Sequence, residues 1–308
     1  MLGSVKSGDG TRLLFFETSG DPKGHPVFLL HGTPGSRVGP RPRTSVLYKL
    51  GIRLISYDRP GYGESQRLKG RAVRHAAADV AAIADQLNLG PFSVLGRSGG
   101  GPHALACAAL LPPRRVASAA ALVSIAPPDA EGLDWFEGMA QSNVIAYEAA
   151  TAAVKNGSAE CLDRLKANLA SNADAIRDKP ESLLGLLTPE MPTADKAVVG
   201  HGGIRGLLLA NYKTSVVRSS FGWLDDVLSF RQDWGFEPGK IVEVPTMLWH
   251  GEHDTFSPVG HFRWLADRIP SATPVLKHEA AHFAALPAVP EILAWLRDRA
   301  RDRFGAVV

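Results

Sequence analysis

The sequence predicts an α/β protein built on a doubly wound, mostly parallel sheet with a long helical insertion. Three observations lead to this prediction. Short apolar runs bounded by Gly, Pro and Asp alternate with segments of helical periodicity along residues 12–125. The alternation resumes at residues 244–277, after a long stretch with helical periodicity. Alternating helices and apolar strands are typical of a parallel sheet covered by helices on both faces.

The predicted strands are short and almost wholly apolar, which indicates burial on both faces. They are expected at residues 12–17, 26–30, 52–57, 92–96, 119–125, 244–250 and 273–277. Residues 72–89 place apolar side chains on one helical face, and residues 99–111 carry Pro102 in the first helical turn, where its missing N–H is tolerated. A further helix is expected at residues 257–269, opened by a Ser-Pro pair.

The chain between Ile125 and Val244 is far longer than the roughly 2–6 residues of an ordinary connection in such a sheet. Its periodicity is helical, so we expect a subdomain rather than a loop. Because this segment leaves the sheet at the carboxyl ends of the strands, we expect it to lie over that edge as a cap. The predicted division is therefore a core, a helical cap insertion and the second part of the core: residues 1–127, 128–240 and 241–308.

Composition narrows the class of protein. The chain has 308 residues, 45% hydrophobic and 21% charged, which is enough for a large core and predicts a globular protein. Its 34 basic and 31 acidic residues give a net charge of +3 without a basic cluster, so we expect no nucleic-acid partner. The N-terminus lacks a signal-peptide pattern and no run of about 18 apolar residues occurs, so we expect a cytoplasmic protein without membrane association.

Two cysteines occur, Cys107 and Cys161, far apart in the sequence. This number and spacing predict neither a disulfide framework nor a thiolate metal site. We therefore expect both to be reduced thiols in the core.

The pentapeptide G-R-S-G-G at residues 96–100 follows an apolar run directly. A G-x-S-x-G at a strand-to-helix junction is the pattern of a nucleophile elbow, in which the serine adopts a strained backbone conformation that flanking glycines leave room for. The pattern predicts that Ser98 is a catalytic nucleophile. The alternative interpretation is a helix N-cap after a Gly-rich turn.

A serine hydroxyl needs a base in hydrogen-bond contact and a carboxylate that orients the base. Asp254 and His282 follow Ser98 in the chain, and this order predicts a Ser98, His282, Asp254 triad. Each partner has an alternative interpretation: His282 as a structural histidine and Asp254 as a turn carboxylate. Asp129, which follows the strand predicted at residues 119–125, stays open as an alternative acid.

Together these motifs resemble the α/β-hydrolase fold family. H-G-T-P-G at residues 31–35 resembles its oxyanion loop, D-R-P-G-Y-G-E-S at residues 58–65 resembles its D-x-x-G-x-G-x-S turn, and H-G-E-H-D at residues 250–254 resembles its acid-bearing turn. The resemblance spans about residues 10–125 and 240–300. Two departures are Ala281, where a Gly often precedes the family's histidine, and the loop H-G-T-P-G in place of the H-G-G-P-G of proline iminopeptidases.

A tetrahedral oxyanion needs two hydrogen-bond donors, one from the residue after the nucleophile and one from the loop after the strand at residues 26–30. We assign these donors to the backbone N–H groups of Gly99 and Thr33. Gly32 and Gly35 leave room for this loop to approach a substrate, and the Thr33-Pro34 bond is a candidate for a cis peptide.

Four further polar residues lie near these motifs. His31 and His250 each precede a Gly at a strand end, and we expect them to stabilise turns. Arg97 and His103 flank the elbow; we expect surface or packing roles for both, and contact with the substrate is the alternative.

One motif favours a different class of enzyme. Residues 278–282 read H-E-A-A-H, which on a helix would place His278 and His282 on one face for zinc, as in a zinc peptidase. The preceding residues 273–277 read as a strand, Pro287 follows soon after, and the H-x-x-G-x-x-H extension is missing. We therefore expect no bound metal, and a non-catalytic ligand-binding member of the fold is the remaining alternative from another class.

The sequence predicts a cofactor-independent serine hydrolase, carboxylesterase-like, that cleaves a small-molecule ester or related acyl bond through an acyl-enzyme. The resemblance also implies carbon–carbon bond hydrolases, lactonases, cofactor-free haloperoxidase-like enzymes and aminopeptidase-like members as alternatives. A serine at position 98 argues against the dehalogenases and epoxide hydrolases of this fold, which carry Asp there. The expected partner is a small molecule, and the pattern specifies no oligomeric state.

Overall fold

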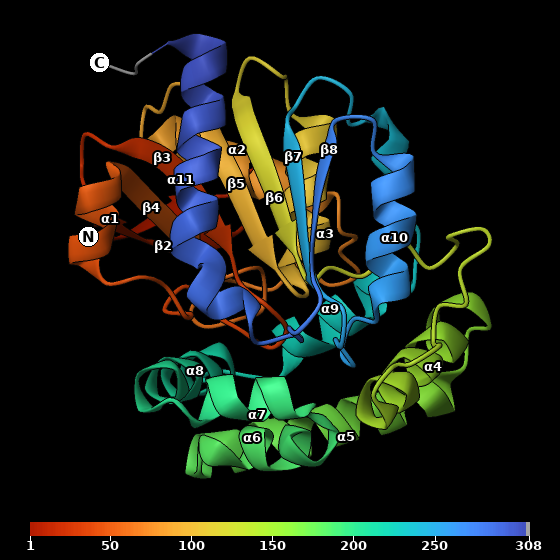
Figure 1. Ribbon diagram of the computed structural model, residues 1–308. Helices are drawn as coiled ribbons and strands as arrows, with labels where there is room; N and C mark the ends of the chain where they lie inside the picture. The colour runs from red at the N-terminus through yellow and green to blue at the C-terminus, as the bar shows by residue number, and fades with distance from the viewer. Residues whose placement is uncertain (306–308) are drawn as a thin grey trace.

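The computed structural model describes residues 1–305 and contains an eight-stranded sheet (Figure 1). The strand order is β1-β2-β4-β3-β5-β6-β7-β8. Strand β1 is antiparallel to β2 and β2 to β4, whereas all other neighbours are parallel. The strands are β1 Leu2–Lys6, β2 Leu13–Gly20, β3 His25–Leu30, β4 Ile52–Tyr57, β5 Phe92–Arg97, β6 Val116–Leu122, β7 Thr246–Gly251 and β8 Ala272–Lys277. The predicted mostly parallel sheet is confirmed.

Helices pack on both faces of the sheet. One face carries α2 (His75–Gln86), α3 (Gly100–Leu110) and α10 (Val259–Arg268), and the other carries α1 (Thr44–Leu50) and α11 (Ala285–Phe304). Each face buries its own apolar cluster. Val94 on β5 belongs to the first cluster, and Leu95, the next residue, belongs to the second. This alternation follows from the two-residue period of a strand buried on both sides, and the doubly wound arrangement is confirmed.

Each strand predicted from the sequence corresponds to an observed strand; β4 has the predicted bounds, and the ends of the others are shifted. The run predicted at residues 119–125 forms β6, which ends at Leu122 because the chain turns at Val123, where φ is 46°. No predicted element corresponds to β1, α1 or α11. Helix α11 contains Pro290 in its interior, and a proline within a segment argues against predicting a helix there.

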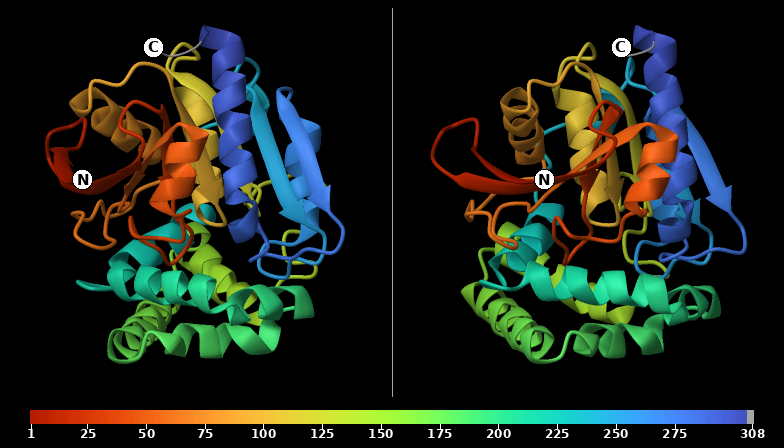
Figure 2. Two further views of the ribbon diagram at one scale, coloured as in Figure 1. Left: turned by 60° about the vertical axis from the view of Figure 1, so that its left-hand side comes forward. Right: turned by 90° about the vertical axis from the view of Figure 1, so that its left-hand side faces the viewer.

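A second group of helices lies across the carboxyl ends of the parallel strands (Figures 1 and 2). It consists of α4 Gln141–Lys155, α5 Ala159–Asp178, α6 Glu181–Leu187, α7 Thr193–Gly200, α8 Gly202–Ser215 and α9 Phe221–Phe230. We call α4 to α9 the helical insertion. Its side chains Leu165 and Phe230 belong to an apolar cluster that also contains Trp135, ahead of α4, and Ala106 on α3, so the insertion packs onto the core. The boundaries predicted at residues 128 and 240 stay predictions.

The two cysteines have different surroundings. Cys107 on α3 is fully buried, as predicted, and burial raises the pKa of its thiol far above the ordinary value. Cys161 on α5 is half-buried, so the prediction of a core thiol is wrong for this residue. Both are free. Across residues 1–305 no helix has the length and apolar composition that crossing a bilayer requires.

Candidate functional site

Ser98 lies between β5 and α3 with φ at 54°, a left-handed conformation that non-glycine residues rarely adopt. Its flanking glycines are required by close backbone contacts. A Cβ on Gly96 would lie 2.0 Å from the carbonyl oxygen of Gly100, and a Cβ on Gly100 would lie 2.1 Å from that of Leu30. Ser98 therefore has the conformation that a nucleophile elbow requires, and its side chain is partly exposed.

Asp254 and His282 come together at the carboxyl ends of neighbouring strands. Asp254 follows β7, His282 lies between β8 and α11, and Nδ1 of His282 is 2.8 Å from Oδ2 of Asp254. The other carboxylate oxygen of Asp254 accepts hydrogen bonds from the backbone N–H groups of Phe256 at 2.8 Å and Ser257 at 2.9 Å. These contacts fix the carboxylate and leave Nε2 of His282 directed away from it.

Asp129, the alternative acid, lies elsewhere. Its side chain is exposed in the turn after β6, and within residues 1–305 no hydrogen bond or ion pair joins it to His282. The structure thus pairs His282 with Asp254, the first of the two acids that the sequence offered.

Ser98 and His282 line one cavity of about 680 Å³. Thr33 and Gly99 line it as well, and the helical insertion supplies most of its wall residues. The wall side chains are mainly apolar and include Ile145, Leu165, Leu169, Leu183, Leu186 and Trp223. A largely apolar cavity with a few convergent polar groups is typical of a small-molecule site.

Thr33 and Gly99 lie against each other beside Ser98. A Cβ on Gly99 would lie 2.1 Å from Oγ1 of Thr33, so only glycine permits this approach. Across residues 1–305 neither backbone N–H donates to another protein group, and both residues line the cavity. The Thr33-Pro34 peptide is cis, as the sequence analysis proposed. The structure therefore brings together the two donors assigned to the oxyanion.

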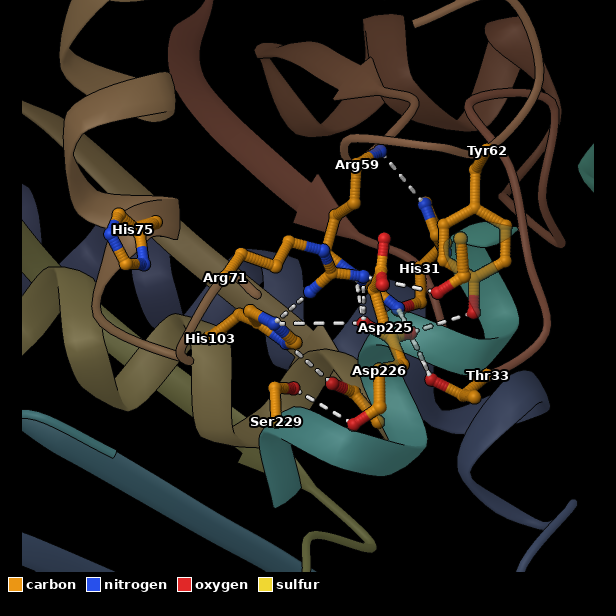
Figure 3. A network of polar contacts seen from close by, with 12 residues as sticks. His31, Thr33, Arg59, Tyr62, Arg71, His75, His103, Asp225, Asp226 and Ser229 are labelled. Carbon is orange, nitrogen blue, oxygen red and sulfur yellow. Dashed lines mark hydrogen bonds and ion pairs between the residues drawn. The ribbon is translucent and has the colours of Figure 1, made fainter. Parts of the chain in front are cut away.

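Asp226 on α9 occupies the centre of a buried charged cluster beside Thr33 (Figure 3). Its carboxylate accepts hydrogen bonds from Nη2 of Arg59 and Nη2 of Arg71, each at 2.5 Å, and from the Tyr62 hydroxyl at 2.8 Å. The Thr33 hydroxyl donates to the same carboxylate. Burial alone would raise the pKa of Asp226, but the Arg59 and Arg71 guanidiniums hold it well below the ordinary value. Asp226 therefore links the helical insertion to the Thr33 loop as an anion.

Asp195 on α7 holds the loop on the opposite side of Ser98. Its two oxygens accept the backbone N–H groups of His282 at 3.2 Å and Phe283 at 2.7 Å. Neither Asp195 nor Asp226 is among the site residues predicted from the sequence. An acidic pair within the apolar run F-G-W-L-D-D-V-L-S-F at residues 221–230 was a usable signal for Asp226, whereas Asp195 lies in no distinctive pattern.

The four further polar residues have the following contacts. Nε2 of His31 accepts from the Arg59 N–H at 3.2 Å, and Nε2 of His250 lies 2.7 Å from the Ser257 carbonyl, so both stabilise turns as predicted. His103 packs under Gly99, with Nδ1 2.7 Å from its carbonyl, and burial, with the Arg59 charge, lowers its pKa to about 3. Arg97 is not on the surface: its side chain is buried and lines the cavity.

The H-E-x-x-H sequence at residues 278–282 does not form a helix. The His278 side chain is 78% exposed and contacts Glu252 at 2.8 Å, whereas the His282 ring turns toward Asp254. In residues 1–305 no three His, Cys, Asp or Glu side chains gather as metal ligands. The structure does not place these two histidines as the zinc motif requires.

Comparison with known proteins agrees with this geometry. The family model described as "alpha/beta hydrolase fold" matches residues 25–288. A non-heme chloroperoxidase of Streptomyces lividans is 27% identical over 304 residues, which span 95% of this chain and 96% of that protein. A bifunctional esterase/perhydrolase of Acinetobacter calcoaceticus is 26% identical over 262 residues, 83% of this chain and 84% of its own.

Among solved structures, the enol-lactonase from Burkholderia xenovorans LB400 superimposes with a TM-score of 0.66 at 18% identity. The superposition covers 96% of this chain and 99% of that one, so the two proteins share their fold along nearly their whole length. The family match over residues 25–288 shows that this chain belongs to the α/β-hydrolase fold family.

Proposed function

We propose that this hydrolase cleaves an ester or related acyl bond of a small molecule through an acyl-enzyme on Ser98, without a cofactor. One observation carries the proposal. His282, oriented by Asp254 at 2.8 Å, lines the same cavity as a serine held in the strained elbow conformation. These are the groups that nucleophilic acyl transfer needs, in the chain order typical of this fold.

In the proposed reaction, Nε2 of His282 takes the proton of Ser98 Oγ as that oxygen bonds to the carbonyl carbon of the substrate. The backbone N–H groups of Thr33 and Gly99 stabilise the oxyanion that develops. His282 then gives the proton to the leaving alcohol. Water, activated by the same imidazole, hydrolyses the acyl-enzyme and restores Ser98.

The role of Asp254 in this mechanism is to hold the tautomer of His282. A carboxylate at Nδ1 keeps the proton on that nitrogen, so Nε2 has a free lone pair when Ser98 is deprotonated. When His282 becomes an imidazolium, the same carboxylate stabilises its charge. The two backbone hydrogen bonds to Asp254 hold its carboxylate in place during both steps.

The alternatives within the fold differ in what the cavity must bind. An aminopeptidase-like enzyme binds an α-ammonium group near the scissile bond, which the buried guanidinium of Arg97 in this cavity would repel. The names of the similar proteins, an esterase/perhydrolase and an enol-lactonase, support acyl chemistry. A panel of acyl esters, lactones and aminoacyl amides would rank these substrates.

The decisive experiment is labelling with a fluorophosphonate followed by mass spectrometry, combined with kinetics of Ser98→Ala. We expect the adduct on Ser98, and kcat lower by at least ~10³-fold in Ser98→Ala, because triad residues act as a unit. Ser142→Ala is the matched control, since Ser142 is an exposed serine in the wall of the same cavity. Full activity in Ser98→Ala, or inhibition by a chelator that zinc reverses, would contradict the proposal.

A further inference from the structure

Arg97 is a buried cation without an anion. Arg97 directly precedes the nucleophile in the sequence and is only 8% exposed. It lines the cavity together with Ser98 and His282. Its Nη1 atom is buried and has no hydrogen-bond partner, and within residues 1–305 no carboxylate forms an ion pair with it. An unpaired buried guanidinium is unfavourable, so a structure that retains one calls for an explanation.

Most of the other buried arginines in residues 1–305 are neutralised by the protein itself. Three of them pair with buried aspartates: Arg37 with Asp58, and Arg59 and Arg71 with Asp226. The exception, Arg231, has no carboxylate partner in this range; its guanidinium lies over the Trp135 ring, and its Nε donates to the Thr151 hydroxyl. Three of these four guanidiniums therefore have a carboxylate partner, and the fourth has an aromatic face and a hydroxyl. Within residues 1–305 the Arg97 side chain has neither a carboxylate partner nor a hydrogen bond, and it lines the cavity that holds Ser98.

The acidic groups nearest to Arg97 are already engaged. Asp254 accepts hydrogen bonds from His282, Phe256 and Ser257, and Asp195 accepts those of the loop that follows β8. These carboxylates and Tyr212 favour the charged form of Arg97 from a distance, but burial outweighs them and lowers its pKa. A carboxylate in the cavity would bind the guanidinium directly and compensate for this burial.

The guanidinium lies close to the nucleophile. A methyl group at Gly32 would lie 3.2 Å from Nη2 of Arg97 and 3.5 Å from Cβ of Ser98, so both side chains approach the same side of Gly32. An anionic group bound there would be only a few atoms from the carbonyl carbon that Ser98 attacks. The apolar walls from the helical insertion then accommodate the remainder of the substrate.

We propose that Arg97 binds a carboxylate of the substrate, and that the preferred substrates are short esters whose acyl group carries a free carboxylate. The proposal rests on the proposed function and names its substrate class. Monomethyl succinate is a suitable representative, because two methylene groups separate its carboxylate from its ester. Ser98 would form the acyl bond, the methoxy group would leave as methanol with the proton from His282, and water would release succinate.

A competing explanation is an internal water molecule. A second cavity of about 20 Å³ lies between Arg97, Ser36 and Leu122, which is room for one water that would accept from the guanidinium. In that case Arg97 is structural, and its replacement would affect charged and uncharged substrates alike. The experiment therefore compares two substrates of the same shape that differ in charge.

The kinetic test is the ratio of kcat/KM for monomethyl succinate to that for methyl succinamate, its uncharged counterpart. We expect a ratio of ~10 or more in the unmodified enzyme and a ~10–100-fold lower ratio in Arg97→Met. Arg97→Lys should give an intermediate ratio, because lysine keeps the charge without the bidentate geometry. Arg164→Met is the matched control, since Arg164 is an exposed arginine of the same cavity wall. Its ratio should stay within about 2-fold of the unmodified enzyme's.

The proposal is wrong if the unmodified enzyme shows no preference for the charged ester, or if Arg97→Met slows both substrates equally. It is also wrong if 3-acetoxypropanoate, which carries its carboxylate on the alcohol side, is preferred over monomethyl succinate. Should Arg97→Met not fold, as circular dichroism would show, the ratios of the unmodified enzyme and of Arg97→Lys still decide the matter.

Binding of succinate by calorimetry separates this proposal from the proposed function. Ser98→Ala should bind succinate, and adding Arg97→Met should weaken binding by ~10-fold or more. If succinate binding needs Arg97 but neither ester is hydrolysed, the carboxylate site stands and the hydrolytic proposal fails. If Ser98 is needed for hydrolysis but succinate binds equally well without Arg97, only the carboxylate site is wrong.

Discussion

Two loops meet at Ser98, and the helical insertion holds each by a buried aspartate in a different way. On one side Asp226 binds the Thr33 hydroxyl and is surrounded by two guanidiniums (Figure 3). On the other side Asp195 accepts two backbone N–H groups of the loop that carries His282, and no guanidinium pairs with it in the described chain. The first anchor is a neutralised ion cluster, and the second is a lone carboxylate bound by peptide dipoles.

The difference shows in the pKa of the two carboxyls. The arginines hold the pKa of Asp226 well below the ordinary value despite burial. Burial raises the pKa of Asp195, because the neighbouring His282 and the two N–H groups only partly compensate for it. Removing the first carboxylate would leave two buried cations, and removing the second would leave two buried N–H groups. The insertion is therefore coupled to the Thr33 loop by charge and to the His282 loop by hydrogen bonds.

The largest effect on kcat is expected at Asp254, whose carboxylate contacts the imidazole ring of His282. Asp254→Asn should lower kcat by about 10⁴-fold, because an amide no longer enforces the tautomer of His282 or stabilises its cation. The measurement is steady-state kinetics on the best ester of the panel. Asp129→Asn is the control, since Asp129 is exposed and should leave kcat nearly unchanged. The reverse pattern would assign the acid to Asp129.

Asp226→Asn should have the largest effect on stability. An amide cannot neutralise Arg59 and Arg71, which stay buried, so the free energy of unfolding should fall by about 3–5 kcal/mol. Urea unfolding followed by circular dichroism measures this. Asp225→Asn is the neighbouring control: Asp225 pairs with Arg67, whose side chain is 26% exposed, and a smaller loss is expected. Equal losses in the two variants would show that the cluster around Asp226 is not a special anchor.

Asp195→Asn should destabilise the protein less, by about 1–3 kcal/mol, because the amide still accepts one of the two N–H groups and leaves the other unpaired.

The effect of pH on stability separates the two aspartates. The folded pKa of Asp226 lies below the ordinary aspartate value of 3.8, so its stabilisation is complete above that value and is lost as the pH falls through the folded pKa. The folded pKa of Asp195 is raised, so its folded state binds more protons and its contribution falls as pH rises above 3.8.

The measurement is the free energy of unfolding of each variant against that of the unmodified protein, from acid to neutral pH. The destabilisation by Asp226→Asn should grow as the pH rises. The destabilisation by Asp195→Asn should instead shrink over the window above 3.8 in which Asp195 titrates. Slopes of the same sign for both variants would contradict the contrast between a neutralised cluster and a lone carboxylate.

The contrast also explains what the sequence could predict. The strands, the elbow at Ser98 and the contact between His282 and Asp254 follow from simple sequence patterns: apolar runs, flanking glycines and chain order. Asp226 acts on Thr33 across 193 positions of sequence, and Asp195 acts on His282 across 87. Such contacts depend on how the insertion packs onto the core, and no local sequence pattern predicts this packing. For Arg97 the packing role agrees with its burial and the surface role does not; no local pattern separates the two, since the elbow motif leaves its second position unspecified.

The smallest effect is expected at Thr33, where the two roles of one residue can be separated. Its backbone N–H is the proposed oxyanion donor, and its hydroxyl contacts Asp226. Thr33→Ala keeps the first and removes the second, so kcat should fall by less than ~10-fold, against the ~10²–10³-fold expected for losing a true oxyanion donor. Thr33→Ser restores the hydroxyl and should recover most of this loss. A loss of ~10² or more in a folded Thr33→Ala would mean that the hydroxyl acts on the oxyanion, or that the Asp226 contact sets the position of the loop. Kinetics of Asp226→Asn distinguishes these, because only the second interpretation predicts an equal loss in that variant.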